Sequence, residues 1–272
     1  MKLFKGPAFE AADEANKLTH LSWIQERTTG MQVFSDDELV VVDSGFATDT
    51  FNVVCRARLS GGMATERVRS VLRHFRSNGR PFAWWVGPAD RPKDLGTVLL
   101  SNGFVAAGTE PGMAADLDGI FSLATVDVSP GGLRIERART EARVREFAET
   151  LAALADPPDP TVVRFYERAS PALLGPESPL WLYVGNVGEE PVASAELTVG
   201  GGVVGLYNIS TRSAHRGKGI GTAMTLQPLL DAREAGFETA VLQASEEGFP
   251  IYSRLGFEVT GSFTEYQPLD AT

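Results

Sequence analysis

The sequence has little of several residue types that whole classes of proteins require. Among its 272 residues there is one cysteine, Cys55, which excludes an internal disulfide and a cysteine-based metal site. Of the three histidines, His20 and His74 lie in the first half and show no spacing typical of metal ligands or of a catalytic triad. No run of about 18 apolar residues occurs, and the N-terminus lacks an apolar signal region. We therefore expect a cytoplasmic protein without a membrane span and without a metal.

Positive charge is also scarce. The formal net charge is −10, from 25 Lys and Arg against 35 Asp and Glu. A surface that binds nucleic acid or an anionic membrane needs a broad excess of basic residues, so both partners are disfavoured. The apolar fraction of 43% is sufficient for the core of one large domain or of two ordinary ones.

Acidic residues are absent from one long stretch, residues 197–230. An even spread of the 35 acids would place about four of them there. The same stretch carries three cations, Arg212, Arg216 and Lys218. In an acidic chain, such a local change of charge favours the binding of an anion.

Three glycines, at positions 217, 219 and 221, refine this interpretation. Glycine has no Cβ, so its backbone can approach a ligand closely or adopt a positive φ without strain. A helix that begins at about Gly219 would direct its unpaired N–H groups and positive dipole end at a phosphate. The loop is therefore predicted to hold a phosphate.

Two common phosphate loops do not fit these residues. A P-loop needs Ser or Thr after its Gly-Lys pair, but Gly219 follows Lys218. The dinucleotide pattern G-x-G-x-x-G fails in both registers, since its third glycine falls on Thr222 or on Met224. What remains is R-x-x-G-x-G over residues 216–221, and an ordinary basic glycine-rich loop stays open from these six residues alone.

The flanking sequence favours the R-x-x-G-x-G loop over an ordinary basic glycine-rich loop. Residues 203–211 alternate like a strand, and an amphipathic helix pattern runs from Ile220 towards Gly236. A second strand at 240–245 is followed by Tyr252, four residues before a Gly-Phe pair at 256–257. With these two motifs in this order, residues 133–272 resemble the GNAT superfamily of acyl-CoA-dependent N-acyltransferases.

The resemblance implies a fold, a co-substrate and a reaction. The fold is α/β (α+β), with a mixed, mostly antiparallel twisted sheet flanked by helices. The co-substrate is acetyl-CoA, no metal takes part, and the acceptor is a primary amine of a small molecule that attacks directly in a ternary complex. The residues expected at the cofactor are Ile209, Ser210 and Thr211 along the pantetheine arm, Arg216, Gly217, Lys218, Gly219, Ile220, Gly221 and Thr222 around the diphosphate, and Ser245.

Two residues are candidates for catalysis. By resemblance, Tyr252 protonates the departing sulfur, although an aromatic side chain that only packs would fit the same pattern. Glu196 is the acid nearest to the acid-free stretch and is the candidate general base, with a solvated glutamate at a strand edge as the alternative. For Ser245, a contact with the cofactor and a simple helix cap both stay open.

The first half of the chain repeats the order of elements found in the second. A strand pattern at 51–57, a turn at 60–62, a helix pattern at 64–76, a strand at 81–87 and a helix at 94–102 end in Gly103-Phe104. We interpret this as a tandem duplication. The first copy lacks R-x-x-G-x-G and has Leu99 at the place of Tyr252. Residues 1–127 are therefore predicted to form a degenerate, non-catalytic GNAT-like domain, and residues 128–272 the domain that binds acetyl-CoA.

Another function and some properties stay open at this point. A protein that binds acyl-CoA for regulation or as a scaffold, without turnover, would keep the same loop. The chain is expected to be a monomer or a homodimer. A proline-rich segment at 156–179 carries Asp156, Asp159, Glu167 and Glu177, which would suit a cationic amine but equally a solvated loop.

Overall fold

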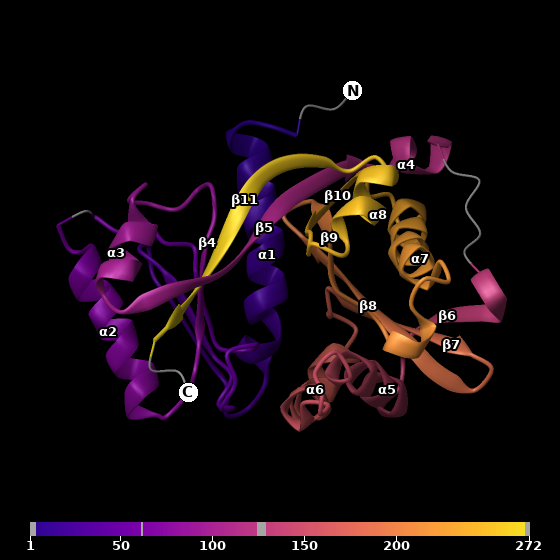
Figure 1. Ribbon diagram of the computed structural model, residues 1–272, viewed down its shortest axis with the longest axis horizontal. Helices are drawn as coiled ribbons and strands as arrows, with labels where there is room; N and C mark the ends of the chain where they lie inside the picture. Colours follow the sequence, from indigo (N-terminus) through magenta and orange to yellow (C-terminus); the bar gives the residue numbers. More distant parts are fainter. Residues whose placement is uncertain (1–3, 61, 124–128, 270–272) are drawn as a thin grey trace. The chain divides into compact units, whose positions relative to one another are not determined.

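The chain forms two compact units, and neither of them is contiguous in sequence. The computed structural model describes residues 4–60, 62–123 and 129–269 (Figure 1). Unit 1 comprises Met1–His20 and Met113–Thr260, and unit 2 comprises Leu21–Gly112 and Gly261–Thr272. The expected junction between residues 127 and 128 lies outside the described residues, as does residue 61 of the expected turn.

These units differ from the expected domains 1–127 and 128–272. Three elements contribute residues to both units: α1 (Pro7–Arg27), β5 (Phe104–Asp116) and β11 (Glu258–Pro268). The start of the chain therefore belongs with the second repeat, and its end with the first. The repeat pattern in the sequence could not reveal this, because it gives the order of elements and not where the first helix and the last strand pack.

Unit 2 is a mixed sheet with two helices. Its elements besides α1, β5 and β11 are β1 (Gln32–Ser35), β2 (Val40–Asp43), β3 (Val53–Cys55), α2 (Ala64–Ser77), β4 (Ala83–Val86) and α3 (Leu95–Ser101). The strand order is β1-β2-β3-β4-β11-β5. Helix α2 buries Val68, Val71, Leu72 and Phe75, the i, i+3, i+4 and i+7 stripe of an amphipathic helix.

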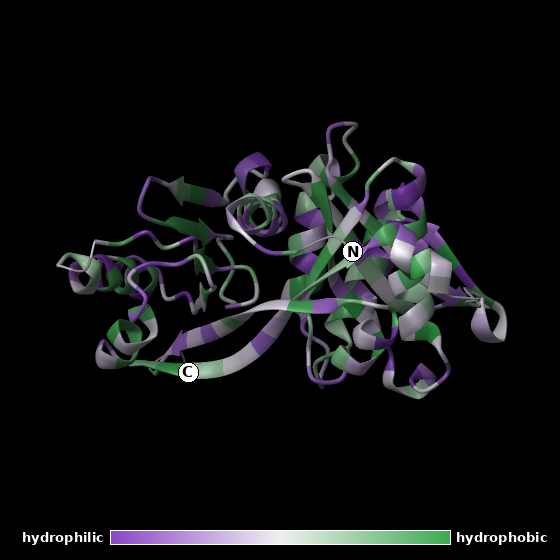
Figure 2. Ribbon diagram, turned by 90° about the horizontal axis from the view of Figure 1, so that it is seen from above, coloured by the Kyte–Doolittle hydropathy of each residue, from purple (hydrophilic) through white to green (hydrophobic). Residues whose placement is uncertain are grey.

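Unit 1 contains a larger sheet, in the order β5-β10-β9-β8-β7-β6. Its elements include α4 (Leu117–Leu123), β6 (Leu133–Arg137), α5 (Glu141–Ala152), α6 (Pro160–Leu173), β7 (Leu180–Val187), β8 (Glu190–Gly200), β9 (Val203–Thr211), α7 (Ile220–Glu234), β10 (Thr239–Gln243) and α8 (Phe249–Arg254). Strands β6 to β9 are antiparallel, and β10 runs parallel to β9. In Figure 2 many of the strands are apolar, whereas many loops are polar.

The repeated order of elements expected from the sequence is present. Each unit contains one parallel strand pair joined by a helix, β3-α2-β4 and β9-α7-β10. Each is followed by a short helix that ends at a Gly-Phe pair. The glycines of these pairs, Gly103 and Gly256, have φ of 83° and 93°, which a residue with a Cβ adopts only with strain. None of the described helices is both long and apolar enough to cross a membrane.

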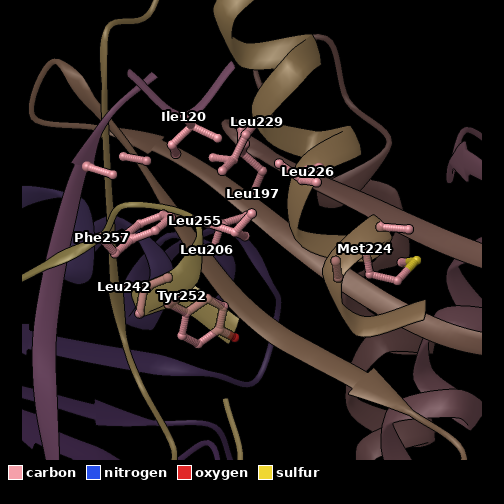
Figure 3. Close-up of a cluster of buried hydrophobic side chains, with 14 of the residues drawn as sticks. Ile120, Leu197, Leu206, Met224, Leu226, Leu229, Leu242, Tyr252, Leu255 and Phe257 are labelled. Carbon is pink, nitrogen blue, oxygen red and sulfur yellow. The ribbon is translucent and has the colours of Figure 1, made fainter. Parts of the chain in front are cut away.

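The two faces of the unit 1 sheet differ in polarity. On one face Leu197 and Leu206 pack with Leu226 and Leu229 of α7 in a buried apolar cluster (Figure 3). The residues that alternate with Leu197 on β8, Ser194, Glu196 and Thr198, are buried and polar. These polar side chains face away from α7, towards α1, α5 and α6. A buried polar face is uncommon in a core and requires partners for every group.

On this side of the sheet, Asn16 of helix α1 bonds to backbone carbonyls and to the Tyr207 hydroxyl. This fully buried amide donates hydrogen bonds to the carbonyl oxygens of Thr198, Gly200 and Val203, at 2.9, 3.3 and 3.1 Å. Its oxygen accepts from the Tyr207 hydroxyl at 2.9 Å. The N-terminal part of α1 is thereby joined to the hairpin formed by β8 and β9.

Asn16→Ala is expected to lower the free energy of unfolding by about 2–3 kcal/mol, because it leaves buried carbonyl and hydroxyl groups without partners. Urea unfolding of the full chain, followed by circular dichroism, measures this change. The matched control is Asn78→Ala, since Asn78 is exposed and its amide donates only to the His74 carbonyl, at 3.0 Å. The control should change stability by less than about 0.5 kcal/mol. Equal effects of the two variants would contradict the anchoring role of Asn16.

Candidate active site

The glycine-rich loop has the backbone that its sequence predicts. Gly217 and Gly219 have φ of 75° and 81°, in the left-handed region, and Gly219 is the N-cap of α7. No side chain caps this helix within the described residues. Its first N–H groups therefore point out of the helix without a side-chain acceptor, where the helix dipole adds positive charge.

The cations of the loop lie around this helix end at the surface. Arg216 is half-exposed, with its Nε 3.1 Å from the Thr211 carbonyl and its Nη1 3.8 Å from Glu247. Lys218 Nζ donates to the Ala214 carbonyl at 3.0 Å. The exposed ion pair of Arg216 and the exposed hydrogen bond of Lys218 contribute little to stability, so both side chains can turn towards a stronger anion.

Strand β9 has a neighbouring strand along only part of one edge. Its pairing with β10 ends at Leu206, which lies opposite Leu242. Its pairing with β8 on the other edge continues to Thr211. Residues 207–211 therefore present an edge that no described strand covers, and this edge leads into the glycine-rich loop. The residues expected along the cofactor, Ile209 to Thr211 and Arg216 to Thr222, are consecutive along this path.

A bulge occurs at the start of the open edge. The register between β8 and β9 shifts between Ser194 and Glu196, and Asn208 on β9 has a φ of +52°. Such a backbone is uncommon for a residue with a Cβ, and Asn tolerates it better than most. The Ser194 hydroxyl donates to the Asn208 carbonyl at 3.1 Å and fixes the bulge.

Tyr252 lies on α8, beside the apolar cluster of α7. Its side chain is 9% exposed, and its ring packs against Phe257 with 5.9 Å between centroids. Figure 3 shows the hydroxyl pointing away from the labelled apolar side chains. The ring thus has a packing role, and the direction of the hydroxyl is compatible with the predicted acid role.

Ser245 has a local structural partner. Its hydroxyl accepts a hydrogen bond from the Gly248 N–H at 3.1 Å, just before α8 begins. The N-cap of α8 is Gly248 and, within the described residues, no side chain caps this helix, so Ser245 is not its N-cap and instead holds the turn that precedes it. A contact between Ser245 and the cofactor stays a prediction.

The sequence left open that Glu196 is a solvated glutamate at a strand edge. That alternative is wrong. Glu196 lies in the middle of β8 and is 1% exposed. Its Oε1 accepts from His20 Nδ1 at 2.7 Å and from the Thr198 hydroxyl at 2.8 Å. Its Oε2 accepts from the Asn208 amide at 3.0 Å.

These partners determine the charge of Glu196. Burial by itself raises the pKa of this carboxyl, but His20 and the hydrogen bonds from Thr198 and Asn208 outweigh burial and bring the pKa below its usual value. Glu196 is therefore a carboxylate at neutral pH. The same burial, together with the charge of Glu196, raises the pKa of Tyr166 and of Tyr207 well above the usual value.

The structure corrects the sequence-based conclusion on His20. We expected no catalytic arrangement around this residue, yet its imidazole contacts Glu196 and belongs to unit 1. The two residues are separated by 176 positions. No motif or periodicity relates residues so far apart, so the sequence carried no signal for this pair.

Two acids of the proline-rich segment have structural partners. Asp159 caps α6 by accepting from the Thr161 N–H at 2.8 Å, and Pro160 follows at the first helical position. Glu167 pairs with Arg145 of α5 at 2.5 Å. Asp159 thus stabilises the start of α6, and Glu167 forms an exposed ion pair with α5.

The comparison with protein families decides how this site is classified. Residues 127–249 match the model of the acetyltransferase (GNAT) domain. This part of the chain, less than half of its length, is therefore similar to a GNAT acetyltransferase domain. Its open strand edge, its glycine-rich loop and the start of α7 all lie within the matched residues.

Similar proteins agree with the GNAT domain. The probable N-acetyltransferase family 8 member 5 of Mus musculus is 34% identical over 87 residues, which are 31% of this chain and 37% of that protein. The match thus spans little more than a third of that relative. A GCN5-related N-acetyltransferase from Kribbella flavida has a similar fold, with a TM-score of 0.69, 19% identity and coverage of 93% of this chain and 95% of that one. A tandem GNAT protein from the clavulanic acid biosynthesis pathway has a TM-score of 0.57, 12% identity and coverage of 88% and 83%.

Glu196→Gln is expected to lower the free energy of unfolding by about 1–3 kcal/mol at neutral pH, because it removes the charge that three donors stabilise. The folded-state pKa of Glu196 lies below its usual value of 4.5, so this stability is present above pH 4.5 and is lost as the pH falls through the folded-state pKa. Urea unfolding at a series of pH values should therefore show a difference from wild type that shrinks in acid. The exposed Glu177→Gln should show no such trend. A difference that is constant with pH would contradict an ionised Glu196.

Proposed function

We propose that this chain transfers an acetyl group from acetyl-CoA to a primary amine of a small molecule, by direct attack in a ternary complex. The observation that carries the proposal is the continuous path from the uncovered edge of β9 to the uncapped N-terminus of α7. A strand edge offers hydrogen bonds to an amide-bearing chain, and a helix N-terminus offers them to phosphate.

The residues along this path fit coenzyme A. The backbone of Ile209 to Thr211 would pair with the amides of the pantetheine arm as a neighbouring strand does. The N–H groups of residues 217–222 would hold the diphosphate, with Arg216 and Lys218 adding positive charge. The thioester of acetyl-CoA supplies an activated acyl carbon.

The surrounding groups supply what acyl transfer needs from the protein. A backbone N–H near the bulge at Asn208 can stabilise the developing charge on the thioester oxygen, a contribution typically worth several kcal/mol. The Tyr252 hydroxyl can protonate the departing sulfur, whose thiol has a pKa of about 8.5 or higher by analogy with cysteine. The carboxylate of Glu196 gives the polar face of the sheet a negative charge, which favours a cationic amine over an anionic acceptor.

A screen of amines, amino acids and aminoglycosides tests the proposal. The readout is the release of CoA thiol from acetyl-CoA in the presence of each acceptor. Cys55 is buried, so the protein itself adds little to the thiol signal. Binding of acetyl-CoA without thiol release for any acceptor would instead favour a regulatory or scaffold protein.

Arg216→Glu should weaken the binding of acetyl-CoA at least about tenfold, because it places a negative charge beside the diphosphate. Isothermal titration measures the affinity, and we expect one site per chain in the wild type. Arg73→Glu is the control, since Arg73 is an exposed residue of α2 in unit 2. It should bind like the wild type. Two equivalent sites, or an unchanged affinity of Arg216→Glu, would refute the assignment of the loop.

Tyr252→Phe should lower kcat about 100-fold or more and change the affinity for acetyl-CoA little, since only the hydroxyl is removed. Steady-state kinetics with an acceptor that turns over measures both. Tyr183→Phe is the matched control, because the Tyr183 hydroxyl donates to Asp231 at 2.8 Å and has only a structural partner. It should cost about 1 kcal/mol of stability and leave kcat near wild type. If Tyr252→Phe also keeps its kcat, the tyrosine only packs.

A further inference from the structure

The side chain of His20 makes two close contacts with the sheet that the structure of helix α1 itself does not need. Its ring stacks on Tyr207 with 3.7 Å between centroids and an interplanar angle of 1°. Its Nδ1 lies 2.7 Å from Glu196 Oε1. The imidazole is therefore held by a flat aromatic surface on one side and by a buried carboxylate at one nitrogen.

This hydrogen bond selects one tautomer of the ring. A carboxylate only accepts hydrogen bonds, so the proton of neutral His20 is on Nδ1. Nε2 then carries the lone pair. Within the described residues no hydrogen bond or ion pair involves His20 Nε2, and the side chain is 19% exposed. The ring thus presents a basic nitrogen that a small molecule can reach.

The stacking partner places this nitrogen in relation to the cofactor path. Tyr207 is the first residue of β9 beyond the last pair with β10, and it lies opposite Glu196 on β8. His20 therefore lies where the edge of β9 becomes uncovered and where the bulge at Asn208 begins. It lies on the polar face of the sheet, whereas α7 lies on the other face.

Unit 2 contains a similar pair, which differs in what neutralises the carboxylate. Asp43 is 1% exposed and lies 2.9 Å from His74 Nε2. Arg80 Nη1 is 2.7 Å from both oxygens of Asp43, and the Gly45 N–H donates to Asp43 at 2.9 Å. The charge of Asp43 is thus satisfied by a permanent cation and by a turn. Within the described residues no Lys or Arg contacts Glu196, and His20 is the basic side chain beside its carboxylate.

We propose that His20 is the general base of the acyl transfer and that Glu196 is a positioning residue that fixes the tautomer of His20. The inference rests on the proposed function. It replaces the expectation that Glu196 accepts the proton itself, because both Glu196 oxygens already accept hydrogen bonds inside the sheet.

The proton and bond changes balance with these two residues and Tyr252. His20 Nε2 takes one proton from the bound ammonium group and later releases it to solvent. The neutral amine nitrogen bonds to the acyl carbon, and the carbon–sulfur bond breaks with its electron pair on sulfur. Tyr252 gives its proton to that sulfur and regains one from the newly acylated nitrogen through water. The products are the amide, the CoA thiol and one proton.

The decisive variant is His20→Asn, whose amide nitrogen can take the place of Nδ1 beside Glu196 while Nε2 is lost. We expect kcat/KM to fall about 100-fold or more, with the affinity for acetyl-CoA within twofold of wild type. The acidic limb of the pH profile of kcat/KM should disappear with it. The ionisable groups that contact the ring, Glu196 and Tyr207, are unchanged in this variant. So are Tyr166, Asp13 and Lys17, whose interactions reach those two residues or each other.

His74→Gln is the matched control, because its amide takes the place of the bonded Nε2 beside Asp43. It should keep the wild-type rate and pH profile. Glu196→Gln should lower kcat/KM and move the acidic limb, since the tautomer of His20 is no longer fixed. An unchanged profile of Glu196→Gln would overturn its positioning role.

A measurement without turnover tests the same inference. The ¹⁵N chemical shifts of the His20 ring at neutral pH should show a protonated Nδ1 and an unprotonated Nε2, and Glu196→Gln should change this pattern. The opposite tautomer in wild type would overturn the proposal. If wild type acetylates an amine and His20→Asn does so equally well, the assignment of His20 as the general base is wrong, while the proposed function stands. If wild type acetylates no amine, the proposed function fails, and the proposed role of His20 fails with it.

Discussion

The proposed site in unit 1 depends on one feature of strand β9, which has a neighbouring strand along only part of one of its edges. Strand β9 is paired with β8 from Val203 to Thr211 apart from the bulge at Asn208, whereas its pairing with β10 stops at Leu206. The remaining residues keep unpaired N–H and C=O groups on one edge, which an isolated sheet normally covers or blunts. Here the chain leaves this edge directly for a glycine-rich loop and an uncapped helix. The open edge and the helix end are thus two successive hydrogen-bonding surfaces for one extended ligand.

The polar face behind this edge needs its own supports. Ser194, Glu196 and Thr198 are buried, and a core accepts such groups only when each finds a partner. Ser194 bonds to Ser210 and the Asn208 carbonyl, and the Thr198 hydroxyl bonds to Glu196. Helix α1 adds His20 beside Glu196 and Asn16 at the turn of the hairpin. Because both residues lie on one helix, a single element positions the hairpin and the imidazole together.

The sequence predicted the local parts of the site well. The glycines at 217 and 219 need a positive φ, and a helix begins after them, because both features depend on neighbouring residues only. The same is true of α8 with Tyr252 and of the strand–helix–strand order in each half. Pairing across 176 positions could not be predicted, since the contact of His20 with Glu196 exists only after α1 has packed on β8. The burial of Glu196 was missed for the same reason.

The domain boundaries were missed because duplication in sequence and compactness in space are different properties. A fragment that begins at residue 128 would contain the loop, Tyr252 and Glu196. It would lack Asn16, so the carbonyls of Thr198, Gly200 and Val203 would lose a buried donor. It would also lack His20, so the buried carboxylate of Glu196 would have one donor fewer, while the hydrogen bonds from Thr198 and Asn208 would remain. The first part of the N-terminal helix therefore belongs to unit 1 on physical grounds, whatever the order of the repeats in the sequence.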